Sequence, residues 1–367
     1  MAVQELPMQT VRARGGRKPI AFLHSFFRSP TDAAITIACL ALLWLVVWPF
    51  VKWVTIDAAW IGQGGGACAN IEGACWVFVR ERMGTFVFGT YPSAERWRVM
   101  LVFAGAIIGV AALLLPRVPG KPKIALVMLT AFPAAAAILL AGGVFGLEPV
   151  PTRNWGGLTL TLVVAIWGIV TTIPIGMALA LGRRSNMFLV RTACAIYVEF
   201  WRALPLLGVL FMAATMFPLF VPPGIEFDKL MRALIAFTLF NAAYMAEVFR
   251  SGLQAINKGQ YEAATALALP YWTSMYKVIL PQAISVALPS FVGTCINILK
   301  MSSIFLAISL YEFLGMVQQG AADPEWLGSH GVLETGFVFA GFVYWCLCFG
   351  MSRYSRHLER TRLKVRT

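Results

Sequence analysis

Long apolar runs constrain the fold of this chain more than any other feature. Eight of them lie in the 367 residues, at about 33–53, 97–115, 124–146, 158–181, 193–221, 230–250, 282–306 and 333–352. Crossing the core of a bilayer takes roughly 20 mainly apolar residues in a helix. Helices and closed barrels alone satisfy their backbone polar groups in lipid. The sequence therefore predicts an all-α, polytopic membrane protein with about eight transmembrane helices.

Charge and composition support this class. Charged residues make up 13% of the chain, whereas soluble proteins hold about 25%. The net charge of +13 does not indicate a nucleic-acid partner, because the bases lie between and beyond the apolar runs. Pro133, Pro174 and Pro205 fall inside three runs. Neighbouring helices can satisfy the backbone groups that a proline frees, so we expect each of these runs to remain one span.

The distribution of bases predicts the orientation. With the N-terminus inside the cell, 20 Lys and Arg residues lie on the inner side and 8 on the outer side. Such a bias marks the cytoplasmic face. We therefore expect both termini in the cytoplasm and the loop at 251–281 on the same side.

The same pattern divides the chain into parts. Residues 1–32 form a cytoplasmic tail without the short apolar core and cleavage site of a removable signal peptide. Residues 33–150 form a three-span extension with an outer loop at 54–96. Residues 151–352 form a denser five-span part, and a basic cytoplasmic tail follows at 353–367.

The reactive residues do not form a catalytic or metal site. The three histidines lack paired spacing, and the spacing of Cys68 and Cys75 is too loose for a metal. These two cysteines share a Gly-rich loop, where they are either free thiols or, in an oxidising compartment, a disulfide. The chain has no GxxxxGK[ST] sequence to cradle phosphates, so energy for any transport has to come from a partner.

Residues 259–283, GQYEAATALALPYWTSMYKVILPQA, predict two short amphipathic helices. In the first, one face carries Tyr261, Ala264, Leu267 and Ala268. In the second, the apolar side carries Trp272, Met275, Tyr276 and Ile279. Pro281 marks the bend into the next span. Such helices can lie on lipid, but Lys277 is the one base available here. An acid-led, alanine-rich first helix fits the groove of a cytoplasmic protein better.

This stretch resembles the EAA loop of the transmembrane subunits of bacterial ATP-binding-cassette (ABC) importers. Glu262, Ala263, Ala264, Leu280 and Pro281 match at the family spacing, while Val278 stands for Ile and Ala268 for Gly. Alanine does not easily take positive φ, so we expect Pro270 to supply the break between the helices. The resemblance implies that an ATP-hydrolysing subunit is contacted by Gly259, Glu262, Ala263, Ala264, Ala268, Leu280 and Pro281.

Other stretches resemble the polar amino-acid branch of these permeases. They are WGGLTLTL (155–162), VEFWRALPLL (198–207), NAAYMAEVFRSGLQAINKGQYEAA (241–264) and LPSFVGTCINILKMSS (288–303). The resemblance covers about 155–352. With the three-span extension at 33–150, the chain is most like a permease of general L-amino-acid importers. It implies a five-helix type I importer core in a bacterial inner membrane, without catalytic activity or a bound cofactor. Its implied partners are an ATPase dimer that binds ATP and Mg, a second permease subunit, expected to form a heterodimer, and a periplasmic amino-acid-binding protein.

Charges inside the predicted spans are costly and therefore face the bundle, pair or line a wet path. Glu199 and Arg202 lie three residues apart, which favours a structural ion pair. Lys300, close to Ser302, is either a helix-to-helix hydrogen-bonding group or part of a substrate path. The candidates for that path are Asn241, Tyr244, Asn297, Lys300 and Ser302.

Two alternatives remain open at this point. A secondary transporter driven by an ion gradient would show broken helices with paired carboxylates or two repeated halves, and neither is evident. A membrane-anchored interaction protein would not need polar groups in several spans.

Overall fold

A computed structural model describes residues 26, 29–115, 118–222, 224 and 227–364. The predicted tail 1–32 thus lies largely outside the described residues. Within them the secondary structure is helical apart from two isolated bridges. Seven helices are long and apolar enough to cross a membrane, or eight if one bent pair counts as a span. The predicted all-α fold and number of spans are confirmed.

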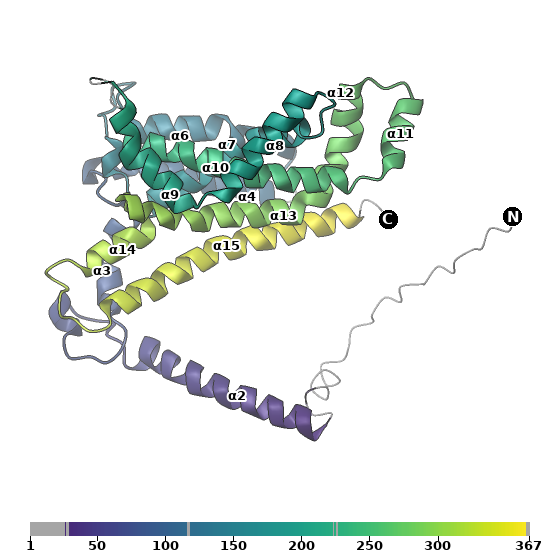
Figure 1. Cartoon of the computed structure of the whole chain (residues 1–367). Coiled ribbons are helices and arrows are strands. Elements are labelled where there is room, and N and C mark those ends of the chain that lie inside the picture. The colour runs from purple at the N-terminus through teal and green to yellow at the C-terminus, as the bar shows by residue number, and fades with distance from the viewer. Residues whose placement is uncertain (1–25, 27–28, 116–117, 223, 225–226, 365–367) are drawn as a thin grey trace.

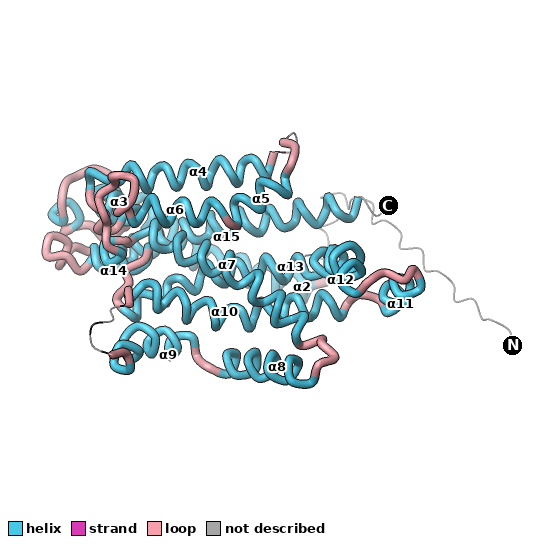
Figure 2. Tube along the Cα trace, turned by 90° about the horizontal axis from the view of Figure 1, so that it is seen from above, coloured by secondary structure: helices cyan, strands magenta, loops and turns pink. Residues whose placement is uncertain are grey.

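Most of the long helices lie side by side in one bundle (Figure 1). Its centre is α10 (Lys229–Gln254), which packs against α7 (Gly157–Gly182) and α13 (Leu280–Met301). The last helix of the chain, α15 (Val332–Lys364), packs on α13. On one side of the bundle lie α4 (Arg96–Leu114), α5 (Lys121–Leu129) and α6 (Ala131–Ala141), and on the other lie α8 (Phe188–Ala203) and α9 (Leu206–Phe211) (Figure 2).

Glycines let α7 and α10 approach their neighbours closely. A Cβ atom on Gly168 would lie 2.8 Å from Phe237 of α10 and 2.9 Å from Ile298 of α13. On Gly176 it would lie 2.8 Å from the Cβ atom of Met245. Small residues at helix crossings increase van der Waals contact where lipid removes the hydrophobic drive for association. These glycines therefore fix the centre of the bundle.

The predicted fifth span, 193–221, is not one straight helix. It consists of α8 and a second segment, Leu206–Phe220, at an angle of 97° to it. The break follows from Pro205, because the preceding Leu204 is extended (φ −85°, ψ 144°), as the residue before a proline prefers. The predicted span is therefore bent at this proline, and the bent pair is the eighth span if its two segments count as one.

Two further boundaries differ from the sequence prediction. The third span, predicted at 124–146, is divided at Thr130 into α5 and α6 and ends at Ala141. Pro133 explains the division, because its ring clashes with the carbonyl group four residues earlier. At the other end of the chain, α15 continues to Lys364. The predicted tail 353–367 therefore begins as helix rather than as a separate segment.

The first span, α2 (Pro30–Val51), has no buried residue. In Figure 1, the first residues of α2 lie away from the bundle, and its last residues lie near α3 (Trp76–Phe88). Its apolar residues cover the whole helix circumference, as expected of a helix surrounded by lipid.

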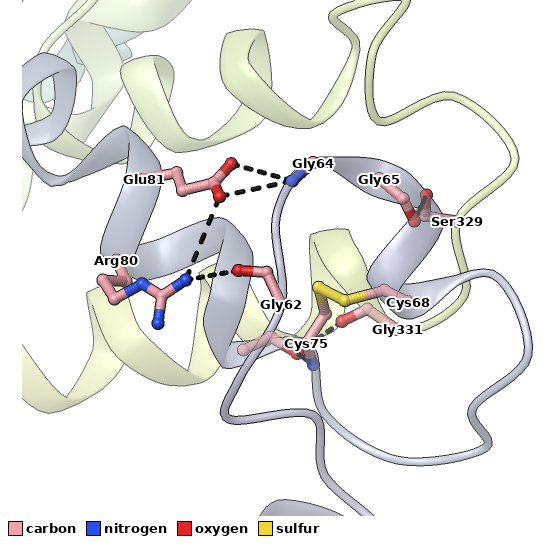
Figure 3. The surroundings of a disulfide bond; sticks show 10 residues. Gly62, Gly64, Gly65, Cys68, Cys75, Arg80, Glu81, Ser329 and Gly331 are labelled. Atoms are coloured by element: carbon pink, nitrogen blue, oxygen red, sulfur yellow. Dashed lines mark hydrogen bonds and ion pairs between the residues drawn. A yellow bond between two sulfur atoms is a disulfide. The ribbon is translucent and has the colours of Figure 1, made fainter.

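Residues 54–96, predicted to form an outer loop, fold against the second part of the chain. Cys68 and Cys75 form a disulfide with Cα atoms 5.8 Å apart, and both are fully buried (Figure 3). The Cys75 amide donates to the Thr335 hydroxyl at 2.7 Å, and the Ser329 hydroxyl donates to the Gly65 carbonyl at 2.9 Å. The loop thus belongs to the same packed cluster as α14 (Phe313–Ala321) and α15. We call this the disulfide end of the molecule.

A buried carboxylate joins three helices near this end. Glu312 caps α14 by accepting from the Leu314 and Gly315 amides, both at 3.0 Å. It also accepts from the hydroxyls of Tyr344 on α15 at 2.8 Å and Thr161 on α7 at 3.2 Å. Burial raises the pKa of Glu312 above its ordinary value, while the donors satisfy its oxygens. The group therefore stabilises the junction of α7, α14 and α15.

Candidate functional site

The predicted helix pair lies at the end of the bundle opposite the disulfide. It consists of α11 (Lys258–Ala266), α12 (Tyr271–Ser274) and a π-helical turn, η8 (Met275–Ile279). Both α11 and α12 run across the direction of the spans, at the end where α15 stops (Figure 1). Asn257 caps α11, and its side chain accepts from the Gly259 amide at 2.9 Å. We refer to residues 258–279 as the α11–α12 segment and to this end as the α11 end.

The turn after α11 is formed by Ala268, which takes φ +51°. The Ala268 amide donates to the Thr265 carbonyl at 2.9 Å, and the Leu269 amide to the Ala264 carbonyl at 3.1 Å. This is the Schellman pattern that ends many helices. The expectation that alanine avoids positive φ here is wrong, because the two hydrogen bonds of the cap offset the backbone cost. Pro270 follows the turn and does not replace it.

Replacing Ala268 by glycine is expected to stabilise this turn by about 0.5–1 kcal/mol, since glycine takes positive φ without steric cost but gains entropy when unfolded. Amide exchange at positions 268 and 269 should be about two- to fivefold slower in the variant than in the unmodified chain. The matched control is Ala263→Gly, at an exposed position inside α11, where glycine costs about 1 kcal/mol and exchange should quicken. Faster exchange in Ala268→Gly would contradict the capping geometry. Hydrogen–deuterium exchange of the purified chain measures both.

Part of α11 faces solvent and part faces the bundle. Glu262 and Ala263 are exposed, whereas Ala264 is buried. Among the described residues, no hydrogen bond or ion pair is recorded for the Glu262 side chain. Glu262 and Ala263 therefore form an exposed surface of one acidic and one small side chain.

The second helix divides its apolar residues between two faces. Met275 and Ile279 are buried, but Trp272 is 58% and Tyr276 66% exposed. The two exposed rings stack with centroids 6.0 Å apart. The prediction that all four residues share one face is wrong. Leu267 of the first helix, predicted to share a face with Ala264, is exposed, whereas Ala264 is buried.

The remaining motif residues join the segment to α13. Leu280 is buried, and Pro281 occupies the first turn of α13, where its missing N–H is tolerated. The Leu280 amide donates to the Met275 carbonyl across the π turn. The Gln282 amide group donates to the Gln260 side chain at 3.0 Å. The segment is thus attached to α13 while its outer surface remains free.

Arg184 attaches the segment to the ends of two further spans. Its Nη1 atom donates to the Tyr261 hydroxyl at 2.8 Å and to the Leu253 carbonyl at 2.9 Å. Its guanidinium also lies over the Tyr261 ring, 5.1 Å from the centroid. Tyr261, the residue directly before Glu262 in the sequence, is therefore held by Arg184 at the end of α7.

A charged cluster lies beside this contact. Arg183 donates to Glu247 of α10 and, at 3.4 Å, to Glu199 of α8. Arg250 donates to the other Glu247 oxygen at 2.6 Å. The predicted Glu199–Arg202 pair is wrong, because α8 directs Arg202 over the Tyr244 ring instead, 5.8 Å from its centroid.

The proposed substrate-path residues do not converge within this chain. Asn241 is buried and donates to the Phe237 carbonyl of its own helix at 2.9 Å. Ser302 is buried, donates to the Leu299 carbonyl and lies 3.4 Å from the Tyr344 hydroxyl. Asn297 and Lys300 are exposed on α13. No hydrogen bond recorded for the described residues joins any two of the five candidates.

The bend between α8 and α9 borders an apolar cavity of about 490 Å³. Its lining includes Trp201, Met216, Phe227 and Arg232. The guanidinium of Arg232 donates to the Ala213 and Ala214 carbonyls at 3.2 and 2.8 Å. This arginine therefore braces the bend rather than offering a free charge.

Comparisons with known proteins identify the family. The family model for the binding-protein-dependent transport system inner membrane component matches residues 172–364. The inner membrane amino-acid ABC transporter permease YhdY of Escherichia coli K12 is 44% identical over 336 residues, covering 92% of this chain and 90% of YhdY. The chain belongs to the amino-acid ABC transporter permease family. As a permease of this family it is a multi-pass inner membrane protein, and ATP hydrolysis resides in a separate subunit.

A second relative also spans the extension. The glutamate/glutamine/aspartate/asparagine permease BztC of Rhodobacter capsulatus is 31% identical over 402 residues, 92% of each chain. Among solved structures, the chain is similar to the crystal structure of an amino acid ABC transporter with histidines, with a TM-score of 0.49 and 25% identity. That match covers 56% of this chain and 92% of the other. In this permease family an ATPase and a substrate-binding protein are the implied partners.

Proposed function

We propose that this permease subunit forms part of the translocation path of an ATP-driven importer of polar L-amino acids. The α11–α12 segment docks on an ATPase dimer, which binds ATP and Mg, and this chain itself binds no cofactor. The observation that supports this most is the exposed Glu262–Ala263 surface on a segment whose other side is attached to α7, α10 and α13. Such a segment can receive motion from a partner and pass it to the spans.

The substrate class follows from the relatives. BztC is named for glutamate, glutamine, aspartate and asparagine transport, and a range of polar L-amino acids is therefore proposed for this chain. Selection among them belongs to a periplasmic binding protein, and a second, homologous permease subunit completes a heterodimeric path. The exposed Asn297 and Lys300 on α13 fit a path shared between two subunits, because neither faces the interior of this one.

We further propose that the α11 end lies in the cytoplasm together with both termini. The start of α2 and the end of α15 lie toward that end in Figure 1, and the disulfide lies at the opposite one. Disulfides persist in oxidising compartments such as the periplasm and are rare in the cytosol.

Peptide mapping without reductant should find Cys68 bonded to Cys75 in native membranes and Cys194 and Cys346 as free thiols. In a strain that lacks the periplasmic thiol oxidase, Cys68 and Cys75 should also be free. Loss of the bond removes about 2.5 kcal/mol of stabilisation for a loop of this length in the chain-entropy model. Two free thiols in the normal strain would contradict the orientation.

The transport mechanism is tested in proteoliposomes that contain this chain with its ATPase, second permease and binding protein. Uptake of radiolabelled L-glutamate and L-glutamine should require ATP on the face of the membrane to which the ATPase is bound. It should persist when the sodium and proton gradients are dissipated. Uptake by this chain alone that follows an ion gradient would favour a secondary transporter and overturn the proposal.

A further inference from the structure

The end of α7 carries two consecutive arginines whose side chains hold different parts of the protein. Arg183 is the C-cap residue of α7, and Arg184 follows in the turn before α8. Because α7 packs along α10 through the centre of the bundle, a force applied at its end acts on the whole bundle.

Arg184 joins the end of α7 to α11 and to the end of α10. One nitrogen reaches both the Tyr261 hydroxyl and the Leu253 carbonyl, and the guanidinium stacks on the Tyr261 ring. Hydrogen bonds from a charged donor are about twice as strong as neutral ones. Two other side-chain bonds join α11 to the spans among the described residues, and both are neutral. The Tyr261 hydroxyl donates to the Leu253 carbonyl at a long 3.4 Å, and the exposed Gln282 donates to Gln260 at 3.0 Å. Arg184 therefore provides the strongest polar attachment of α11 to the bundle among these residues.

Arg183 holds the same helix end to the neighbouring spans. Its side chain is 19% exposed, and the guanidinium bridges Glu247 of α10 and Glu199 of α8. Arg250 binds the second oxygen of Glu247, so this carboxylate is fixed from two sides. A planar guanidinium fork restricts the geometry of such contacts more than an ammonium group does. The end of α7 is consequently rigid with respect to α8 and α10.

We propose that Arg183 and Arg184 are positioning residues that transmit the displacement of α11 to the transmembrane bundle. Arg184 is the link to α11, and Arg183 anchors the end of α7 that carries this link. The inference rests on the proposed function of the α11–α12 segment. A partner that moves Glu262 also moves the adjacent Tyr261, and Tyr261 moves Arg184 and the ends of α7 and α10 with it. Without Arg184, α11 can shift while the spans remain in place.

The test uses the complete importer in proteoliposomes with its binding protein and radiolabelled L-glutamate and L-glutamine as probes. For Arg184→Ala, we expect ATP hydrolysis without substrate to stay within twofold of the unmodified complex, while amino acid taken up per ATP hydrolysed falls at least fivefold. Arg184→Lys keeps a cation over the ring and should recover part of that ratio. Tyr261→Phe should lower the ratio less than Arg184→Ala, and adding it to Arg184→Ala should cause little further loss.

Arg191→Ala is the matched control, because Arg191 is exposed on α8 and its side chain makes no hydrogen bond or ion pair with another described residue. Its ratio should not change. A purely structural role for Arg184 would lower the yield of complex but leave uptake per ATP unchanged, and this result would overturn the inference. Additive losses in the Arg184/Tyr261 double variant would overturn it as well. If the unmodified complex shows no ATP-dependent uptake, the proposed function itself fails, which is a different result from a coupled complex that tolerates Arg184→Ala.

Discussion

Glu262→Lys should reduce ATP-driven uptake at least tenfold while the chain is still inserted in the membrane in normal amount. Glu262 is the fifth of the nine residues of α11, beyond its first turn, so the helix dipole adds little to the cost of losing this exposed acid. Placing a like charge in a partner's groove, in contrast, costs several kcal/mol. Because no contact of Glu262 is recorded among the described residues, the larger effect falls on docking rather than on folding. Co-purification of the ATPase with the permease measures docking, and uptake measures its consequence.

Glu72→Lys is the matched control for this change. Glu72 is also an exposed glutamate, but it lies in the loop at the disulfide end, so the same charge reversal should leave the amount of bound ATPase unaltered. Normal ATPase binding and uptake by Glu262→Lys would contradict the role assigned to this residue.

Gly176→Val should reduce the amount of folded permease in the membrane several-fold. The added Cβ atom would lie 2.8 Å from Met245 Cβ and 3.0 Å from the Ala246 backbone nitrogen. A backbone atom cannot rotate away, so α7 and α10 would have to separate. Overpacking of this kind costs about 1–3 kcal/mol, a large part of the stability of a typical domain. Monodisperse protein recovered after detergent extraction and size-exclusion chromatography provides the measurement.

Gly341→Val on α15 controls for the change of residue type, because a Cβ atom at Gly341 would meet nothing within 4 Å. Its yield should match that of the unmodified chain. Equal yields of the two valine variants would mean that the close approach of α7 and α10 does not stabilise the bundle.

The positions of the central spans were predictable because hydrocarbon imposes a length and an apolar composition on each of them. The effect of individual prolines was not. Pro174 lies within a continuous α7, whereas Pro205 accompanies a bend of 97°. Both have the same missing N–H, so the difference depends on which neighbouring helix packs there. That information comes from contacts between segments far apart in the sequence.

The candidate site shows the same limit at shorter range. The helical spacing of Tyr261, Ala264 and Leu267, together with Pro270, identified two helices and a break between them. It did not identify Ala268 as the residue with positive φ, since the cap hydrogen bonds that offset its backbone cost depend on where α11 ends. Apolar residues at 272, 275, 276 and 279 fit two alternative helical stripes, and packing buries only Met275 and Ile279.

In the sequence, Arg183 and Arg184 served only as two of the bases that predict which face of the membrane is cytoplasmic. Arg183 and Glu247 are 64 residues apart, and Arg184 and Tyr261 are 77 apart. Neither separation produces a periodic pattern. The signal that was available is the charged Glu247 at the edge of a span, with Arg250 one helical turn away.

Photo-crosslinking from position 263 tests the docking of the α11–α12 segment most directly. A photo-reactive amino acid replaces the exposed Ala263 in membranes that also contain the tagged ATPase subunit of the same importer, and Ile61 in the disulfide-end loop serves as the comparison site. The account predicts a crosslink to the ATPase from position 263 and none from position 61. Crosslinks from position 263 to lipid alone, in membranes that import amino acids at the normal rate, would contradict it.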